Sequence, residues 1–438
     1  MSEQIINYIA SPTSKIQGEI KVPGDKSVSH RSIMLGSLAD GVTHVSGFLE
    51  GEDALATLKA FKAMGVKIEG PDNGEVTIHG VGMNGLQKPS TNLDLGNSGT
   101  SMRLMAGLLS GQNFECTLTG DRSLSSRPMK RVTEPLALMN ANIETNDGKA
   151  PLFIKGSNSL KAIHYDMPIA SAQVKSCLLL AGMYAEGVTS VIEPGVTRDH
   201  TERMLQAFQY PVTTKGNKIS LEGGHILKAC DLSIPGDISS AAFFMVGASI
   251  AEGSELLIKN VGINPTRTGV IDILKLMGGD LSIVKEYQCG GEPVADILVK
   301  SAKLKGIVIP EHLVPLAIDE FPVLFVAAAC AEGTTVLTGA KELRVKESDR
   351  IQVMADGLVT LGIDAKPTED GIIINGGKLT SGKVYAHDDH RIAMSFSIAS
   401  LCSKGIITIE DCANVVTSFP GFVGLANSVG MSIQEEYA

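Results

Sequence analysis

Hydrophobic and polar positions follow a repeating order that predicts short strands and apolar helices in turn. Six times, a short strand is followed by a polar turn and an apolar helix, and a glycine ends that helix, as C-terminal glycines do. These glycines are about 70 residues apart: Gly41, Gly111, Gly187, Gly253, Gly333 and Gly405. A second strand, a second helix and a further strand follow each of them, so the pattern predicts six related modules.

Two segments show that the halves of the chain are also related. Val22–Gly41 and Ile234–Gly253 share Pro-Gly-Asp-x-Ser, an apolar helical pattern and a final acid-Gly. We therefore expect an α/β protein of two similar three-module domains. Residues 22–234 would form the first domain, and residues 1–21 with 235–438 the second. Because ligands favour domain interfaces, we expect the active site in an interdomain cleft.

Composition narrows the class of function. The 438 residues are 43% hydrophobic and 20% charged, as in folded globular proteins, and the net charge of −10 disfavours a nucleic-acid partner. The seven cysteines never form Cys-x-x-Cys, so neither a disulfide framework nor a structural zinc site is indicated. The longest apolar run, 321–331, is too short to span a membrane. We expect a cytoplasmic protein without a membrane partner.

The predicted strand-to-helix turns collect polar and cationic side chains. Helix N-termini offer free N–H groups and positive partial charge, so such turns can cradle anions. Serine, asparagine and aspartate there can equally be simple helix caps. Caps do not explain the cations, which oppose the helix dipole unless an anion is present. The residues concerned are Lys26, Ser27, Arg31, Asn97, Ser98, Gly99, Thr100, Arg103, Ser171, Gln173, Asp388, His390 and Arg391, with Arg127 at a further helix start.

Two carboxylates could move protons. Glu347 lies beside Lys346 and three residues before Arg350 at a helix start, although this cluster could be a solvated ion-pair network. Asp319 stands in an otherwise apolar run, where burial would raise its pKa and suit it to act as a base. The alternative for Asp319 is a helix cap.

Two cofactor motifs can be set aside. Residues 80–85 fit the dinucleotide pattern G-x-G-x-x-G, but no helix follows, so a loop is expected. The His387–Arg391 stretch is too compact for all its ligands to reach one metal ion. We expect no metal or cofactor. The residues thus indicate an enzyme for small, multiply anionic metabolites, and the alternative is a non-catalytic anion-binding scaffold.

Six segments along the whole chain resemble the 5-enolpyruvylshikimate-3-phosphate (EPSP) synthase family. They are GDKSVSHR (24–31), LGNSGTSMR (95–103), RPMKRV (127–132), SAQVKS (171–176), LRVKESDR (343–350) and DHRIAMSF (389–396). The resemblance implies an inside-out α/β barrel of the enolpyruvyl transferase type, with three βαβαββ repeats in each domain. It also implies a monomer that transfers the enolpyruvyl group of phosphoenolpyruvate to the 5-hydroxyl of shikimate 3-phosphate and releases phosphate.

The resemblance also implies roles for individual residues. Phosphoenolpyruvate would be held by Lys26, Asn97, Gly99, Arg127, Arg350 and Arg391. Shikimate 3-phosphate would be held by Lys26, Ser27, Arg31, Ser171, Gln173, Arg198, Asp319 and Lys346. The proton-transfer groups would be Asp319, which takes the 5-hydroxyl proton, and Glu347, with Lys26 as a further catalytic residue.

The sequence departs from the family pattern at two places. Thr417 and Ser418 stand where many members have a lysine that helps to hold phosphoenolpyruvate, and Leu104 stands where glyphosate-sensitive relatives commonly have proline. Both departures imply weak inhibition by glyphosate. The nearest alternative is the related transferase for a UDP-linked amino sugar, which has a reactive loop cysteine and a Lys-Asn pair. Here Lys26 is followed by Ser27, and Cys116 lies in a predicted strand.

Overall fold

The computed structural model describes residues 5–157 and 159–437. These residues divide into two compact units. One unit comprises residues 24–234 with the four-residue segment Cys289–Glu292, and we call it the 24–234 unit. The other comprises the preceding N-terminal residues, Pro235–Gln288 and the chain from Pro293 onward, and we call it the terminal unit.

The 24–234 unit contains three repeats of one plan. The first runs through α1 (Lys26–Leu38), β4 (Val42–Ser46), α2 (Glu52–Ala63), β5 (Lys67–Asp72) and β6 (Glu75–His79). The second contains β7 (Leu93–Asp94), α3 (Gly99–Ser110), β8 (Glu115–Thr119), α4 (Arg122–Ser126), α5 (Lys130–Leu138), β9 (Asn142–Asn146) and β10 (Lys149–Lys155). The third contains β11 (His164–Asp166), α6 (Ala172–Gly182), β12 (Val188–Ile192), α7 (His200–Ala207), β13 (Val212–Lys215) and β14 (Lys218–Glu222). The short strands β3 (Ala39–Asp40) and β15 (Leu227–Lys228) pair with each other.

The terminal unit repeats the plan. Its first repeat contains α8 (Ile238–Ile250), β17 (Glu255–Gly262), α9 (Gly269–Leu276), β18 (Asp280–Cys289) and β19 (Glu292–Lys300). The next contains η1 (Glu311–Leu313), α10 (Phe321–Cys330), β20 (Thr334–Leu337), η2 (Lys341–Val345), α11 (Arg350–Thr360), β21 (Asp364–Pro367) and β22 (Ile372–Asn375). The last contains β23 (Gly382–Tyr385), α12 (His390–Ala399), η3 (Ser400–Cys402), β24 (Ile407–Glu410), η4 (Ala413–Thr417), α13 (Phe422–Ser428) and β25 (Ser432–Tyr437).

Among the described residues, five of the repeats centre on a four-stranded mixed sheet, and β20-β22-β21 is a three-stranded antiparallel sheet. The sheet order β7-β8-β10-β9 is typical, with a parallel first pair and antiparallel pairs after it. The same order recurs in β11-β12-β14-β13. A parallel pair joined through a helix, followed by a hairpin, is the βαβαββ unit, so the α/β prediction is confirmed.

The chain passes from one unit to the other near residue 23 and again near residue 234. At each of these two crossings, the last strand before the crossing pairs with a sheet other than that of the helix that follows it. β2 (Gln17–Lys21) directly precedes α1, yet it pairs in parallel with β17 of the terminal unit. β16 (Leu232–Ser233) directly precedes α8, yet it pairs with β4. The strand pattern places each of them in the module that follows, and this assignment is wrong because the ladder partner is a non-local choice. The predicted domain bounds, with residues 1–21 in the second domain and residues 22–234 in the first, instead agree with the observed pairing. β1 (Ile6–Ser11) fills the remaining place, between β24 and β25.

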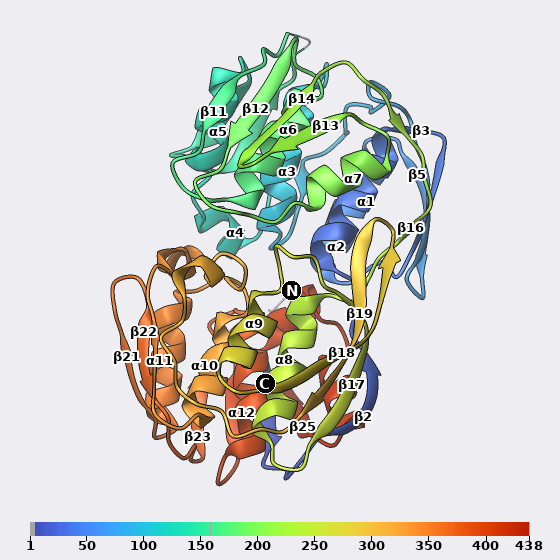
Figure 1. Cartoon of the computed structure of the whole chain (residues 1–438). Helices are drawn as coiled ribbons and strands as arrows, with labels where there is room; N and C mark the ends of the chain where they lie inside the picture. The colour runs from blue at the N-terminus through green and yellow to red at the C-terminus, as the bar shows by residue number, and fades with distance from the viewer. Residues whose placement is uncertain (1–4, 158, 438) are drawn as a thin grey trace. The chain divides into compact units, whose positions relative to one another are not determined.

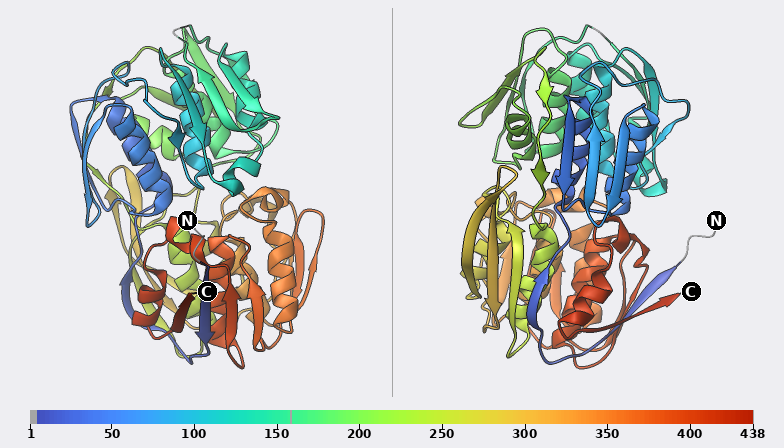
Figure 2. Two further views of the ribbon diagram at one scale, coloured as in Figure 1. Left: turned by 180° about the vertical axis from the view of Figure 1, so that it is seen from behind. Right: turned by 90° about the vertical axis from the view of Figure 1, so that its right-hand side faces the viewer.

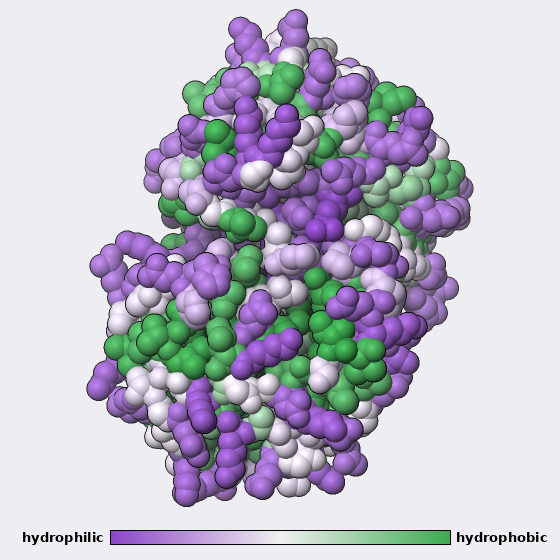
Figure 3. Space-filling view, in the orientation of Figure 1, coloured by the Kyte–Doolittle hydropathy of each residue, from purple (hydrophilic) through white to green (hydrophobic). Residues whose placement is uncertain are grey.

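Helices occupy the interior of each unit and sheets lie outside them, as Figures 1 and 2 show. The first helix of every repeat is the buried one, and α8 and α10 are apolar on nearly all sides. Two separate hydrophobic cores result, one in each unit. Polar side chains cover much of the face in Figure 3, where apolar side chains gather mainly on the terminal unit. Every helix in the described ranges is too short or too polar to cross a lipid bilayer.

Close packing of α3 on α6 gives a test of the helical interior. A Cβ added at Gly107 would lie 2.1 Å from the backbone oxygen of Cys177, so the two helices would have to separate. We expect Gly107→Ala to lower the free energy of unfolding by about 2 kcal/mol or more. Gly424→Ala is the matched control, because a Cβ at Gly424 in α13 would meet no atom of the described ranges within 4 Å. Urea denaturation measures the free energy of unfolding of both variants. Equal values for the two would contradict the close contact between α3 and α6.

Candidate functional site

The N-terminal ends of α1, α3 and α6 meet within the 24–234 unit. Arg31 in α1 donates a hydrogen bond to Ser176 Oγ of α6 at 2.9 Å, and Gln173 of α6 donates to Thr100 Oγ1 of α3 at 3.1 Å. Arg103 Nη1 also donates to the side chain of Gln173. Three positive helix ends therefore converge, as an anion site requires.

Arg31 is a buried cation whose hydrogen bonds go to neutral oxygens. Its guanidinium, in a residue 5% exposed, donates to Thr201 Oγ1 at 2.7 Å, to the Ser27 carbonyl at 2.9 Å and to Ser176 Oγ. In the part of the chain that the structure describes, no carboxylate forms an ion pair with it. Burial lowers the pKa of Arg31 to about 10, although Glu202 and other carboxylates partly oppose this effect and Arg198 adds to it. An anionic ligand would supply the missing negative charge.

Arg127 is held above the start of α3. It donates to Asn97 Oδ1 at 2.6 Å and to Ser123 Oγ at 3.1 Å, and Asn97 in turn donates to Asp121 at 2.7 Å. A Cβ at Gly99 would lie 3.1 Å from Arg127 Nη1. Glycine at this position therefore lets the guanidinium lie against the first turn of the helix.

The remaining expected residues of the 24–234 unit occupy the same helix starts. Lys26, at the first position of α1, forms a 3.0 Å ion pair with Asp53 of α2. Ser171 is the N-cap of α6 and accepts from the Val174 amide. Ser27 contributes its carbonyl to Arg31, and Arg198 lies near enough to repel the charge of Arg31.

A second cluster, in the terminal unit, is centred on Arg350 at the start of α11. Its guanidinium, 1% exposed, contacts three carboxylates: Glu347 at 2.6 Å, Asp389 at 2.8 Å and Asp319 at 3.3 Å. These carboxylates raise the pKa of Arg350 above its usual range against the opposing effect of burial. Arg350 is therefore charged, and it holds the carboxylates of Asp319 and Glu347 at one centre.

The surroundings of Asp319 differ from the expectation. The sequence predicts an apolar setting, but Asp319 lies in the turn before α10 and pairs with Lys346 at 3.5 Å as well as with Arg350. The apolar residues around it in sequence belong to α10, which turns inward and leaves Asp319 at the polar end. Two cations therefore stabilise its ionised form. The cap alternative is also wrong, because the N-cap of α10 is Glu320.

The structure thus gathers Lys26, Asn97, Gly99, Arg127, Ser27, Arg31, Ser171, Gln173 and Arg198 in one unit, and Asp319, Lys346, Glu347 and Arg350 in the other. Arg391 is in the first turn of α12, directly after Asp389 and His390. Its amide donates to Asp389 Oδ1 at 2.9 Å. The backbone of α12 therefore also fixes the Arg350 cluster.

Sequence reasoning missed several supporting residues. Asp53, Thr201 and Asp389 each hold an expected cation, but they are distant from it in sequence. Only Asp389 carried a signal, because it is an aspartate directly before a helix in the DHR segment. Partners from other repeats have no local pattern that could identify them.

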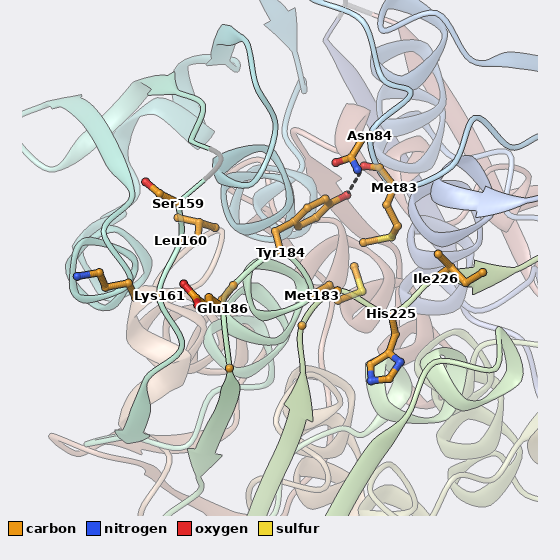
Figure 4. Close-up of a pocket in the computed structure, with 14 residues that line it drawn as sticks. Met83, Asn84, Ser159, Leu160, Lys161, Met183, Tyr184, Glu186, His225 and Ile226 are labelled. Carbon is orange, nitrogen blue, oxygen red and sulfur yellow. Dashed lines mark hydrogen bonds between the residues drawn. The ribbon is translucent and has the colours of Figure 1, made fainter.

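A pocket of about 550 Å³ lies at the other end of α6, around its C-cap Met183. Its lining includes Tyr184, whose hydroxyl donates to the Met83 carbonyl at 3.0 Å, and His225 (Figure 4). It contains none of the expected site residues. Buried charge, and not this pocket, therefore marks the candidate site.

The Arg350 cluster makes a stability prediction. Asp389→Asn keeps an N-cap oxygen for α12 but removes the fully buried carboxylate that faces Arg350. We expect the free energy of unfolding to fall by about 3 kcal/mol. Asp349→Asn is the control, because Asp349 is also an N-cap paired with an arginine but its side chain is 36% exposed. A loss of the same size in both variants, measured by urea denaturation, would contradict the role of burial.

Comparison with known proteins agrees with this geometry. Residues 10–425 match the family EPSP synthase (3-phosphoshikimate 1-carboxyvinyltransferase). The 3-phosphoshikimate 1-carboxyvinyltransferase of Hydrogenovibrio crunogenus is 65% identical over 436 residues, covering 98% of each chain. That of Methylococcus capsulatus is 62% identical over 435 residues, covering 99% of this chain and all of the relative.

Solved structures give the same result for the fold. EPSP synthase from Acinetobacter baumannii, 62% identical, superposes with a TM-score of 0.89 over 99% of this chain and 100% of the other. The enolpyruvyl transferase NikO from Streptomyces tendae is only 15% identical but has a TM-score of 0.80, so it shares the two-domain inside-out α/β fold. The resemblance in the six sequence motifs is confirmed, and the chain belongs to the EPSP synthase family, the 3-phosphoshikimate 1-carboxyvinyltransferases.

Proposed function

We propose that this chain carries out the family reaction with the two clusters described above. Enolpyruvyl transfer joins phosphoenolpyruvate to the 5-hydroxyl of shikimate 3-phosphate and releases phosphate. Both substrates carry a phosphate and a carboxylate, so the reaction needs fixed cations. The observation that carries the proposal is Arg31, a buried guanidinium with neutral hydrogen-bond partners at three converging helix starts.

Shikimate 3-phosphate is assigned to the α1 and α6 starts. Arg31 and Arg198 supply positive charge, and the polar groups of Ser27, Ser171 and Gln173 supply hydrogen bonds. The residues proposed to hold shikimate 3-phosphate also include Lys26, Lys346 and Asp319. The repulsion between Arg198 and Arg31 supports this assignment, because an anion between them would relieve it.

Phosphoenolpyruvate is assigned to the α3, α11 and α12 starts. Arg127, braced by Asn97 over Gly99, presents a guanidinium at the positive end of α3. Lys26, Arg350 and Arg391 provide the other cations. Arg391 adds a cation at the start of α12.

Proton transfer is assigned to Asp319 and Glu347. In the addition step the 5-hydroxyl loses its proton, its oxygen bonds to C2 of phosphoenolpyruvate, and the methylene carbon gains a proton to become methyl. In the elimination step that methyl loses a proton, the double bond re-forms and the C–O bond to phosphate breaks. Two carboxylates near one guanidinium can serve the two proton sites separately. Asp319 takes the hydroxyl proton and Glu347, with Lys26, serves the methylene carbon.

The amino-sugar transferase alternative lacks its nucleophile here. Cys116 lies in β8, and burial raises its pKa to about 12, so its thiol stays protonated. One chain supplies all the proposed residues, so we take the monomer as the active unit. All seven cysteines are free, which supports a reducing compartment such as the cytoplasm.

Phosphate release tests the proposed reaction. The purified protein is incubated with phosphoenolpyruvate alone, with shikimate 3-phosphate alone, and with both. We expect phosphate only from the complete mixture, because addition must precede elimination. Release with a UDP-linked amino sugar, and not with shikimate 3-phosphate, would show that the amino sugar is the acceptor substrate. No release in any mixture would favour a binding scaffold.

Glu347 tests the proton assignment. Glu347→Gln keeps a hydrogen-bond acceptor for Arg350 but removes the ionisable group. We expect kcat to fall by about 10²-fold or more while both KM values change by less than about threefold. Glu369→Gln, at a side chain that is 84% exposed, is the control and should match the wild type. Near-normal kcat in Glu347→Gln would disprove the assignment.

Thr201 tests the setting of Arg31. Thr201→Val removes the hydroxyl that accepts from Arg31 Nε and leaves a buried donor without that partner. We expect KM for shikimate 3-phosphate to rise about tenfold, with kcat and KM for phosphoenolpyruvate nearly unchanged, and Thr201→Ser to restore it. Thr189→Val is the matched control, because the buried Thr189 hydroxyl has no hydrogen-bond partner among the residues that the structure describes. A rise in KM for both substrates would indicate general damage instead.

A further inference from the structure

A buried lysine that the proposed reaction does not use joins two carboxylates inside the 24–234 unit. The ammonium of Lys175, near the start of α6, lies 2.7 Å from a carboxylate oxygen of Glu193 and 2.7 Å from one of Glu202. The side chain of the lysine is 1% exposed, and those of both glutamates are 6% exposed. We call these three residues the Lys175 triad. Because removal of one member would leave a buried charge unpaired, the triad fixes the three segments that carry it.

Glu193 connects the triad to the loop that leads from β12 to α7. Its second carboxylate oxygen accepts from the amide of Thr197 at 3.0 Å and from the hydroxyl of the same residue. The backbone of Glu193 is itself held, because its amide donates to the Asn217 carbonyl at 2.9 Å and its carbonyl accepts from Asn217 Nδ2 at 2.8 Å. Thr197 directly precedes Arg198. The Glu193 carboxylate therefore anchors the backbone next to Arg198.

Glu202 connects the triad to Arg31. It directly follows Thr201, whose hydroxyl accepts from Arg31 Nε at 2.7 Å and donates to Ser176 Oγ at 2.7 Å. Ser176 directly follows Lys175 and also accepts from Arg31, at 2.9 Å. Burial raises the pKa of Glu202, and Lys175 opposes this effect, so the ammonium favours the ionised carboxylate. The residues next to the Lys175–Glu202 pair thus hold the guanidinium of Arg31 by two hydrogen bonds.

The two arginines need such an anchor because they repel each other. Arg198 lies close enough to Arg31 to contribute to the lowering of its pKa. Arg31 is fixed within α1, but Arg198 lies in the loop before α7, which repulsion would push away until an anion arrives. A loop that is already held in place spares the ligand the cost of ordering it, and so raises its affinity.

We propose that Lys175 is a positioning residue for the binding of shikimate 3-phosphate. Through Glu193 it holds the loop of Arg198, and through Glu202 it holds Thr201 and the guanidinium of Arg31. Its own charge is balanced by the two carboxylates, so it acts through these neighbours and not by contact with the substrate. This inference rests on the function proposed above, which assigns both arginines to shikimate 3-phosphate.

Calorimetric titration of the full-length protein with shikimate 3-phosphate, without phosphoenolpyruvate, tests the proposal. Lys175→Met keeps the apolar stem and removes the ammonium, and we expect Kd to rise about tenfold or more. Steady-state kinetics should show KM for phosphoenolpyruvate and kcat changed by less than about twofold, because the α3 and α11 starts are untouched. Leu180→Ala is the matched control, since it shortens a core side chain of the same helix, and its Kd should stay within about twofold of the wild type.

Thr197 provides a milder test that keeps all the charges. Thr197→Val removes the hydroxyl that donates to Glu193, and we expect Kd for shikimate 3-phosphate to rise about fivefold, whereas Thr197→Ser should bind like the wild type. Added to Lys175→Met, the change Thr197→Val should alter Kd by less than about twofold, because the connection is already broken. This lack of additivity separates positioning by Lys175 from two independent losses of stability.

The outcomes distinguish this inference from the proposed function. A wild-type protein that does not bind shikimate 3-phosphate would contradict the proposed function, and the inference with it. If the wild type binds, the positioning role alone is overturned by an unchanged Kd in Lys175→Met, by an equal loss in Leu180→Ala, or by additive effects in the double variant. If Lys175→Met does not fold, equal affinities of Thr197→Val and Thr197→Ser overturn it.

Discussion

Positive charge at the starts of buried helices is the constraint on which this structure depends. In each unit the first helix of every repeat is packed inside, so its N-terminal N–H groups and the cations beside them lie in a poorly hydrated setting. Such charge is tolerable only with a balancing anion or dense hydrogen bonding. The N-cap side chains of Asp25, Ser98, Ser171, Asp237 and Asp389 supply part of this balance. The positive charge that these caps leave unbalanced is available to anionic ligands.

The two units apply the same plan with opposite electrostatics. Around Arg31 the partners are hydroxyl and carbonyl oxygens, so the guanidinium keeps its full charge for a bound anion. Around Arg350 the partners are three carboxylates, so the guanidinium organises acidic groups instead. A duplicated fold has thereby specialised. In the proposed reaction, one copy binds substrate anions and the other also moves protons.

Strand exchange at the crossings explains how one chain makes two complete sets of sheets. β2 and β16 each flank a crossing and each pair with the sheet that the chain is leaving or has yet to build. β1, at the start of the chain, completes the sheet of the last repeat beside β25. The terminal unit therefore cannot be complete until both ends of the chain are present.

The six repeats, the α/β class and most of the cations at helix starts can be predicted from the sequence. Those features are local, because glycine stops, apolar periodicity and Ser or Asp caps act within a few residues. The ladder partners of β2 and β16, the cations around Asp319, and the contacts by which Asp53, Thr201 and Asp389 hold proposed site residues appear only in the folded chain. These contacts join residues far apart in sequence. Their energies come from burial and pairing, which no local pattern records.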